Sequence, residues 1–132
     1  MKKLIFILMV GSLFMGCIGI NQWLTMQNLS QSSKVQAGMT KNEVRDIMDE
    51  PILTELDRGV EEWHYCRSDN HPPKDRFLAI YFIDNKVIAK IFYTRWKSNI
   101  FDLKFDNMGS CEHFIKTGDY KVPPEVQAIL EK

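Results

Sequence analysis

The sequence of 132 residues lacks an excess of either charge, because 17 lysine and arginine residues balance 17 aspartate and glutamate residues. It has no basic block, so its charge pattern does not favour nucleic-acid binding. It also lacks a glycine-rich phosphate-binding loop. Three histidines and three cysteines offer little material for a nucleophile, a base and an orienting third group. These absences argue against an enzyme or a small-molecule substrate, and we expect no cofactor and no metal.

A long apolar stretch opens the chain. Two lysines precede an almost unbroken apolar run over residues 4–15, and Gly16 and Cys17 follow it. A positive segment, an apolar segment and a small residue, in this order, are typical of a secretory signal peptide. We therefore expect residues 1–16 to be removed as a lipoprotein signal peptide. Cys17 would then be the acylated N-terminus that anchors the protein in a membrane.

An uncleaved membrane helix is the alternative for this stretch. Residues 4–20 are close to the lower limit of about 17 residues for a membrane span. Phe14 and Met15 are also less usual before a lipidated cysteine than leucine and a small residue. Behind the cysteine, residues 17–33 are uncharged up to Ser33 and have no sustained periodicity. We predict that they form a tether between the lipid and the folded domain.

Thr40 begins the first clear local signal. Glu43 lies three residues later and completes a capping box. Three apolar residues from Val44 onward share one helical face, and Pro51 disfavours the α conformation of the residue before it. The pattern predicts a helix over residues 41–48 that is too short to be stable alone and must pack on an apolar surface.

The middle of the chain has strand patterns. Residues 61–66 are rich in aromatic side chains suited to a pleated surface. Residues 77–83 and 87–93 flank a short polar connection and predict a hairpin, whereas residues 68–75 have the composition of a loop. Turns are expected at residues 57–59, 84–86 and 107–110. We therefore expect an α+β fold in which short N-terminal helices pack on a three-stranded antiparallel meander.

Alternation in the central strand predicts two apolar faces. Side chains in a strand alternate between the faces of the sheet. One face would carry Phe77, Ala79, Tyr81 and Ile83, and the other Leu78, Ile80 and Phe82. This pattern implies either cover on both sides of the sheet or an exposed patch for a partner.

The end of the chain is predicted to be an extension of the domain, starting at about residue 106. Pro123 and Pro124 predict the start of a final short helix. Lipidation of Cys17 would leave Cys66 and Cys111 as an even pair, which in an oxidising compartment usually forms a disulfide. We predict this disulfide.

A zinc site is the alternative use of these cysteines. His64 and Cys66, with Cys111 and His113, offer two cysteines and two histidines, and His71 is a further histidine. Structural zinc sites usually have two to four residues between paired ligands, whereas only one lies between them here. The disulfide is therefore favoured over zinc, and free thiols are the third alternative.

The order of these signals resembles the SmpA/OmlA (BamE-like) family of outer-membrane lipoproteins. Residues 35–48 are similar to the Gly-Met-Thr helix start of that family, and Pro51 lies where its helix-ending proline falls. Residues 63–65 are similar to its Trp-x-Tyr strand, and residues 82–87 to its second hairpin. The resemblance covers roughly residues 34–93. It implies that residues 34–132 form one BamE-like domain with a C-terminal extension.

The resemblance implies a non-enzymatic adaptor or scaffold related to outer-membrane β-barrel assembly factors. Its partners would be the membrane, through the lipid, and envelope proteins, including barrel-assembly components. Ile18 rather than aspartate follows Cys17, so nothing there signals retention in the inner membrane. We expect the periplasmic face of the outer membrane. The alternative is a periplasmic inhibitor-like, stress-related or lysis-related binding lipoprotein on the same scaffold.

Overall fold

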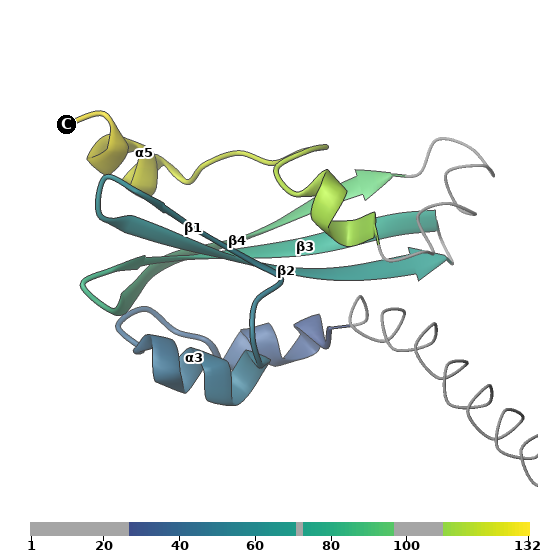
Figure 1. The fold of residues 1–132 in the computed structure, drawn as a ribbon, viewed down its shortest axis with the longest axis horizontal. Helices are drawn as coiled ribbons and strands as arrows, with labels where there is room; N and C mark the ends of the chain where they lie inside the picture. The colour runs from purple at the N-terminus through teal and green to yellow at the C-terminus, as the bar shows by residue number, and fades with distance from the viewer. Residues whose placement is uncertain (1–26, 71–72, 97–109) are drawn as a thin grey trace, which may run out of the picture.

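The computed structural model describes residues 27–70, 73–96 and 110–132 and has an α+β fold. The four antiparallel strands of its sheet are neighbours in chain order: β1 (Leu53–Asp57), β2 (Val60–Asn70), β3 (Pro73–Ile83) and β4 (Lys86–Trp96). Helix α3 (Lys41–Met48) and the 3-10 helix η1 (Leu29–Lys34) cover one face of the sheet (Figure 1). The C-terminal segment, with η2 (Ser110–Phe114) and α5 (Pro124–Leu130), crosses the opposite face.

Helix α3 begins and ends where the capping signals predict. The Thr40 hydroxyl accepts a hydrogen bond from the Glu43 N–H at 3.3 Å, and the Glu43 carboxylate accepts one from the Thr40 N–H at 2.7 Å. The helix ends at Met48, and Asp49 follows with a φ of 64°. Val44 and Met48 are buried against the sheet. The predicted capping box and helix range are confirmed.

Replacing Thr40 with alanine should lower the free energy of unfolding by about 1 kcal/mol, because the first turn loses its side-chain acceptor. Urea unfolding followed by circular dichroism measures the change. Thr40→Ser keeps the hydroxyl and is the matched control, so its stability should stay close to that of the parent. Equal midpoints for Thr40→Ala and the parent would show that the cap does not stabilise this helix.

The predicted hairpin is also confirmed. Asp84 and Asn85 connect β3 to β4 with φ values of 47° and 64°. Positive φ at both central residues is the type I′ geometry that matches the twist of a hairpin. The connection has two residues rather than the three expected, because Lys86 already pairs with Ile83.

Two predictions about the sheet are wrong. The meander has a fourth strand, β1, which pairs with β2 through a turn at Arg58 and Gly59. All five residues of β1 are exposed, so no alternation of apolar residues marked it in the sequence. The predicted loop over residues 68–75 is largely strand, because β2 and β3 stay in register to Asn70 and Pro73.

The tether is shorter than predicted, since its last residues belong to the fold. Leu29 and Ser32 are only 5% and 4% exposed and lie under the sheet. The Gln27 side chain accepts a hydrogen bond from the backbone N–H of Cys66 at 2.9 Å. A 3-10 helix of six residues has too few turns to show periodicity in the sequence. The signal peptide and the rest of the predicted tether, including Cys17, lie outside the described residues. So do residues 107–109 of the turn predicted at residues 107–110, whereas Ser110 begins η2.

Both faces of the sheet are buried, which answers the question raised by its alternation. The face toward α3 and η1 carries Trp63, Tyr65, Leu78, Ile80, Phe82 and Val87. The opposite face carries Val60, Cys66, Phe77, Ala79, Tyr81, Ala89 and Tyr93. In the described parts of the chain, no helix has the length and apolar content needed to cross a membrane.

Candidate functional site

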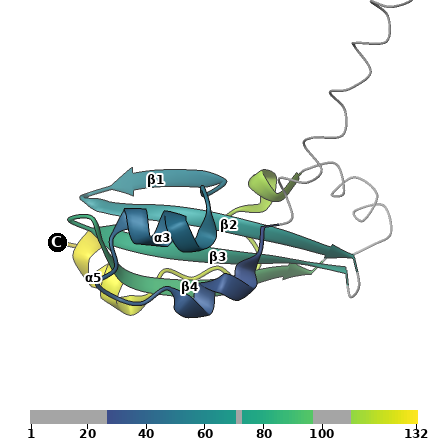
Figure 2. The same ribbon diagram turned by 90° about the horizontal axis from the view of Figure 1, so that it is seen from below.

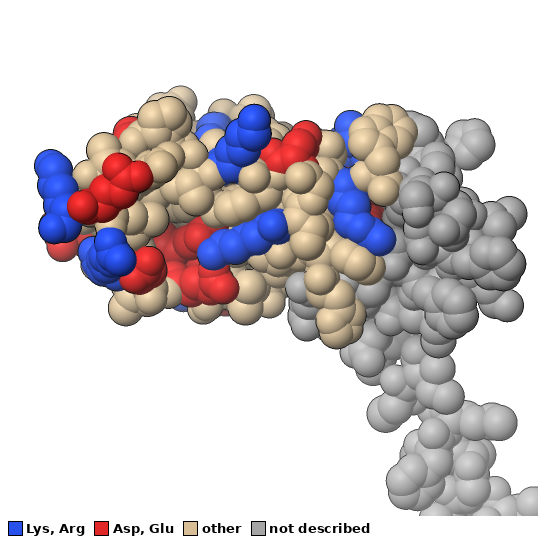
Figure 3. Space-filling model, turned by 90° about the horizontal axis from the view of Figure 1, so that it is seen from above, with Lys and Arg blue, Asp and Glu red and all other residues tan. Residues whose placement is uncertain are grey.

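The candidate site is the sheet face under residues 110–132, a segment that we call the C-terminal strap. Cys111 and Val126 are buried against this face, and Phe114, Ile115, Tyr120 and Val122 pack around them. Between the strap and the end of the β1–β2 hairpin lies a hollow of about 290 Å³, lined by Glu55, Glu62, Tyr81, Lys116 and Tyr120 among others. Seen from the strap side, the surface carries interspersed acidic and basic side chains (Figure 3). The strap therefore closes the second apolar face and leaves a hollow at its margin, lined by both charged and apolar side chains.

Covalent and backbone links hold the strap on the sheet. Cys66 on β2 and Cys111 on η2 form a disulfide in the structure, with their Cα atoms 6.1 Å apart. The Asp119 N–H donates to the Thr94 carbonyl on β4 at 3.2 Å. Near the C-terminus, the Arg58 guanidinium donates to the Leu130 carbonyl. The strap is thus attached along its whole described length.

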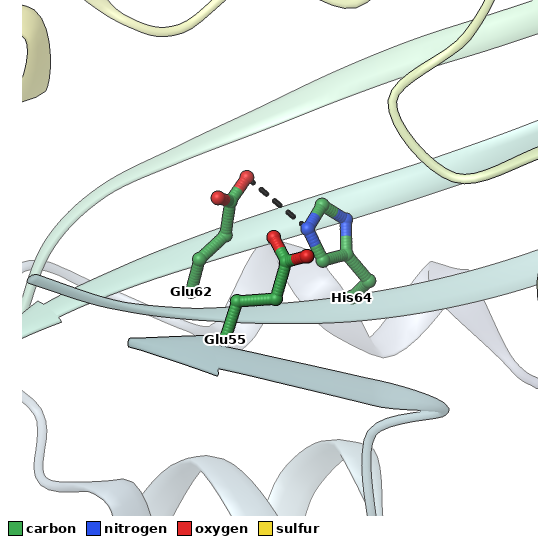
Figure 4. Close-up of side chains that lie close together, drawn as sticks. All are labelled: Glu55, Glu62 and His64. Carbon is green, nitrogen blue, oxygen red and sulfur yellow. Dashed lines mark ion pairs between the residues drawn. The ribbon is translucent and has the colours of Figure 1, made fainter. Parts of the chain in front are cut away.

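A buried polar cluster lies at the centre of the covered face. Glu62 and His64 project from β2 and Glu55 from β1, all toward the strap (Figure 4). His64 is fully buried, and its Nε2 lies 3.1 Å from Glu62 Oε1. Its other ring nitrogen, Nδ1, lies 3.1 Å from the Tyr93 hydroxyl. The imidazole is therefore held from both sides.

The strap supplies the groups that neutralise this cluster. The Lys116 ammonium lies 3.0 Å from Glu62 Oε2 and also contacts Glu55. The Lys116 backbone N–H donates to the Tyr93 hydroxyl at 3.2 Å. Tyr120 donates to the Glu62 carboxylate, and its hydroxyl lies 2.8 Å from that of Tyr81. Glu62 thus accepts a hydrogen bond from Tyr120 and pairs with Lys116, both of the strap, and also contacts His64 on its own strand.

These contacts decide the ionisation of Glu62. Burial alone would raise the pKa of its carboxyl, but hydrogen bonds from His64, Tyr120 and Lys116 outweigh burial and lower the pKa to about 2. Burial likewise opposes the charged form of Lys116, but its bonds to Glu55 and Glu62 raise the pKa of the ammonium. The folded protein therefore favours an ionised pair at this point.

Lowering the pH should lower the free energy of unfolding, because Glu62 becomes protonated. Because the folded pKa lies below the ordinary value of 4.5, the carboxylate stabilises the fold fully above pH 4.5 and loses this effect as the pH falls toward about 2. The contribution is about 3 kcal/mol. Urea unfolding between pH 3 and 7 should show a shallower pH dependence for Glu62→Gln than for the parent. Glu125→Gln, at an exposed position on α5, is the control; the same pH dependence in Glu62→Gln and the parent would contradict the assignment.

The arrangement is better suited to fixing the strap than to catalysis or metal binding. Glu55, Glu62 and His64 each offer a ligand atom, all within 4.8 Å of one another. The Lys116 ammonium already contacts both carboxylates, so a cation would have to displace it. Two carboxylates, those of Glu55 and Glu62, thus come together here, and Lys116 pairs with both. The cluster is an ion-paired anchor for the strap.

The cysteine and histidine residues weighed for zinc are not gathered into a four-ligand site in the described part of the chain. Cys66 and Cys111 are joined to each other, and His113 is exposed. His64 contacts Glu62 and Tyr93 instead, and His71 lies outside the described residues. The cluster that does form was missed because its partners are far apart in sequence, with a sequence separation of 61 between Glu55 and Lys116. One signal was available: alternation in β2 places Glu62 and His64 on the same face as the buried Val60 and Cys66.

Comparison of the sequence with known proteins shows one family to which the chain is similar. No curated protein matches the chain. The family model described as the outer membrane protein assembly factor BamE domain matches residues 25–91, which is more than half of the chain. The match includes η1, α3, the first three strands and half of β4, whereas the strap lies beyond it. The chain therefore belongs to the BamE domain family.

Proposed function

We propose that this protein is a non-enzymatic outer-membrane lipoprotein that acts as an adaptor in the assembly of outer-membrane proteins. One observation carries the proposal: the BamE assembly-factor domain matches most of the helix-covered half of the fold. Helices η1 and α3, the capped entrance to α3 and the meander up to the middle of β4 fall within the match. Fold alone does not fix function, but here a family of assembly factors is matched in sequence over more than half of the chain.

Binding rather than turnover fits the polar groups of the described residues. Glu62 and His64 are buried titratable side chains of the covered face, and both are already engaged, Glu62 by Lys116 of the strap and His64 by Glu62 and Tyr93. A general base or nucleophile needs a reacting group within hydrogen-bond reach in a site that a substrate can enter. Tyr120 and Lys116 occupy that position around Glu62. The protein would therefore work through its surface.

We further propose that Cys17 carries the lipid and holds the domain at the periplasmic face of the outer membrane. The first described element is η1, which begins at Leu29. A fully extended chain from Cys17 to Leu29 would reach about 40 Å. The domain would thus stay within one domain diameter of the membrane surface, where barrel proteins are inserted.

Deleting the gene tests the proposed role. We expect less folded barrel protein in the outer membrane, measured by the mobility difference between heated and unheated samples on gels. Full-length protein supplied in trans should restore the level. Unchanged amounts of folded barrel proteins, with unchanged permeability of the outer membrane to large antibiotics, would contradict the proposal.

A second candidate function is a periplasmic binding lipoprotein outside barrel assembly, acting as an inhibitor or in stress or lysis. One observation favours it: the strap lies beyond the matched residues and covers an entire sheet face. A deletion strain with normal barrel proteins but altered survival under envelope stress would support this function instead of the first.

A further inference from the structure

One edge and most of both faces of the sheet are closed by the protein itself, although Phe92 and Trp96 at the far end of β4 stay exposed on the face toward α3. Helices α3 and η1 cover one face and the strap covers the other. The edge strand β4 is closed at both ends by backbone contacts. Gly38 donates to the Val87 carbonyl and Val87 to the Met39 carbonyl, each at 2.8 Å, and the Asp119 N–H bonds to Thr94 at the far end. The outer edge of β1 has no such cover among the described residues.

Strand β1 presents backbone groups as well as apolar side chains at this edge. It lies at the margin of the sheet away from β4 (Figure 2). The two-residue turn after Asp57 makes Asp57 and Val60 a hydrogen-bonded pair, so Glu55 and Leu53 also bond toward β2. The N–H and C=O groups of Thr54 and Leu56 therefore point outward. The Leu56 side chain is 72% exposed, which is unusual for a large apolar residue at a free edge.

The acidic residues of β1 argue against a second copy of this chain as the occupant of the edge. An antiparallel pairing that overlaps all five residues would place Glu55 opposite Glu55 of the other copy. The next register, with Leu56 opposite Leu56, would place Glu55 opposite Asp57. Like charges directly opposite each other destabilise a strand pair. The Asp57 side chain is 72% exposed, and its nearest described cation is Arg58 at 3.9 Å. The Glu55 carboxylate, by contrast, already contacts the Lys116 ammonium.

We propose that the outer edge of β1 binds an extended segment of a partner protein, which adds to the sheet as a further strand. Backbone groups of Thr54 and Leu56 would supply the hydrogen bonds. Charge complementarity calls for lysine or arginine opposite Asp57, since Glu55 already contacts Lys116. The alternate residues of the segment face Thr54 and Leu56 and would be apolar. This inference rests on the proposed adaptor role and assigns to it a surface and a class of partner.

Binding of a synthetic strand tests the proposal with full-length protein in detergent. The probe is a labelled, end-blocked peptide of alternating lysine and valine, and a peptide of alternating glutamate and valine is its control. Fluorescence anisotropy should show binding of the first peptide and much weaker binding of the second. Asp57→Lys should reduce the affinity for the lysine peptide. Asp46→Lys makes the same charge change on α3 and should reduce it less.

A second pair of variants, at Thr54, distinguishes backbone pairing of strands from simple charge attraction. Thr54→Pro removes an outward N–H and leaves the bonds to β2 intact, so affinity should fall about tenfold, as expected for one lost hydrogen bond. Thr54→Ala keeps the N–H and should bind like the parent. Circular dichroism checks that each variant is folded, and Asp57→Lys remains informative if the proline variant is not. Three results would overturn the proposal. The first is equal binding by the parent, Asp57→Lys and Thr54→Pro, and the second is no binding of either peptide. The third is a dimer of the parent that Thr54→Pro dissociates. Because purified protein is used, these failures would leave the proposed role in assembly untouched.

Discussion

Replacing both Cys66 and Cys111 with alanine is expected to lower the free energy of unfolding by about 4 kcal/mol, since the disulfide closes a loop with a sequence separation of 45. This value comes from the loss of chain entropy in the unfolded state. Small domains have total stabilities of about 5–15 kcal/mol. The disulfide would therefore supply a large share of the stability of this domain.

The effect should be concentrated in the strap. Hydrogen exchange of the double variant should show lost protection over residues 110–132, whereas α3 and the β3–β4 hairpin, which have their own packing, keep theirs. A reducing agent should bring the parent to the stability of the variant and leave the variant unchanged. Two alkylatable thiols at these positions in the untreated protein, with or without bound zinc, would contradict the disulfide.

Replacing Cys17 with serine should remove the protein from the membrane fraction. The motivation is the apolar run that ends at Gly16 and Cys17. Each buried methylene of an acyl chain contributes about 0.8 kcal/mol, so the chains of a lipidated cysteine hold a protein almost permanently. The variant should appear as soluble periplasmic protein or as unprocessed precursor of higher mass.

Ile18→Ala, which leaves Cys17 in place, is the control for this experiment and should remain in the membrane. Mass spectrometry of the parent should show a chain that begins at Cys17 and carries acyl groups. If Cys17→Ser has the same fractionation and shows the same processing as the parent, the N-terminal stretch is an uncleaved helix and not a lipoprotein signal.

Local signals predicted the elements whose stability is decided by neighbours in sequence. The capping box of Thr40 and Glu43 lies within one helical turn, and the turn at Asp84 and Asn85 is decided by two residues. The final helix after Pro123 was also predicted and begins at Pro124. Strand β1 had no such signal, because its five exposed residues are held only by pairing with β2. Helices and turns were thus predictable where interactions between neighbouring residues in the sequence stabilise them.

The site was less predictable because the strap joins residues that are distant in sequence. Alternation over residues 77–83 predicted two apolar faces, but it could not say what covers the second one. Between η2 and α5 the strap that covers it is irregular, so no period marks the side chains that are buried there. Lys116 meets Glu55 and Glu62 only after the chain has returned to β1 and β2. Long-range packing, and not local propensity, therefore built the polar cluster.

Cross-linking in intact cells tests the central claim most directly. A photoreactive residue introduced at Leu56, which is exposed on β1, should capture proteins of the outer-membrane barrel-assembly machinery from cells that express the lipidated, full-length chain. The same residue at Glu131, at the far end of the strap, is the control position. Mass spectrometry of the captured material should identify assembly components at Leu56 and fewer at Glu131. Capture of other envelope proteins alone, with no assembly component at either position, would contradict the account.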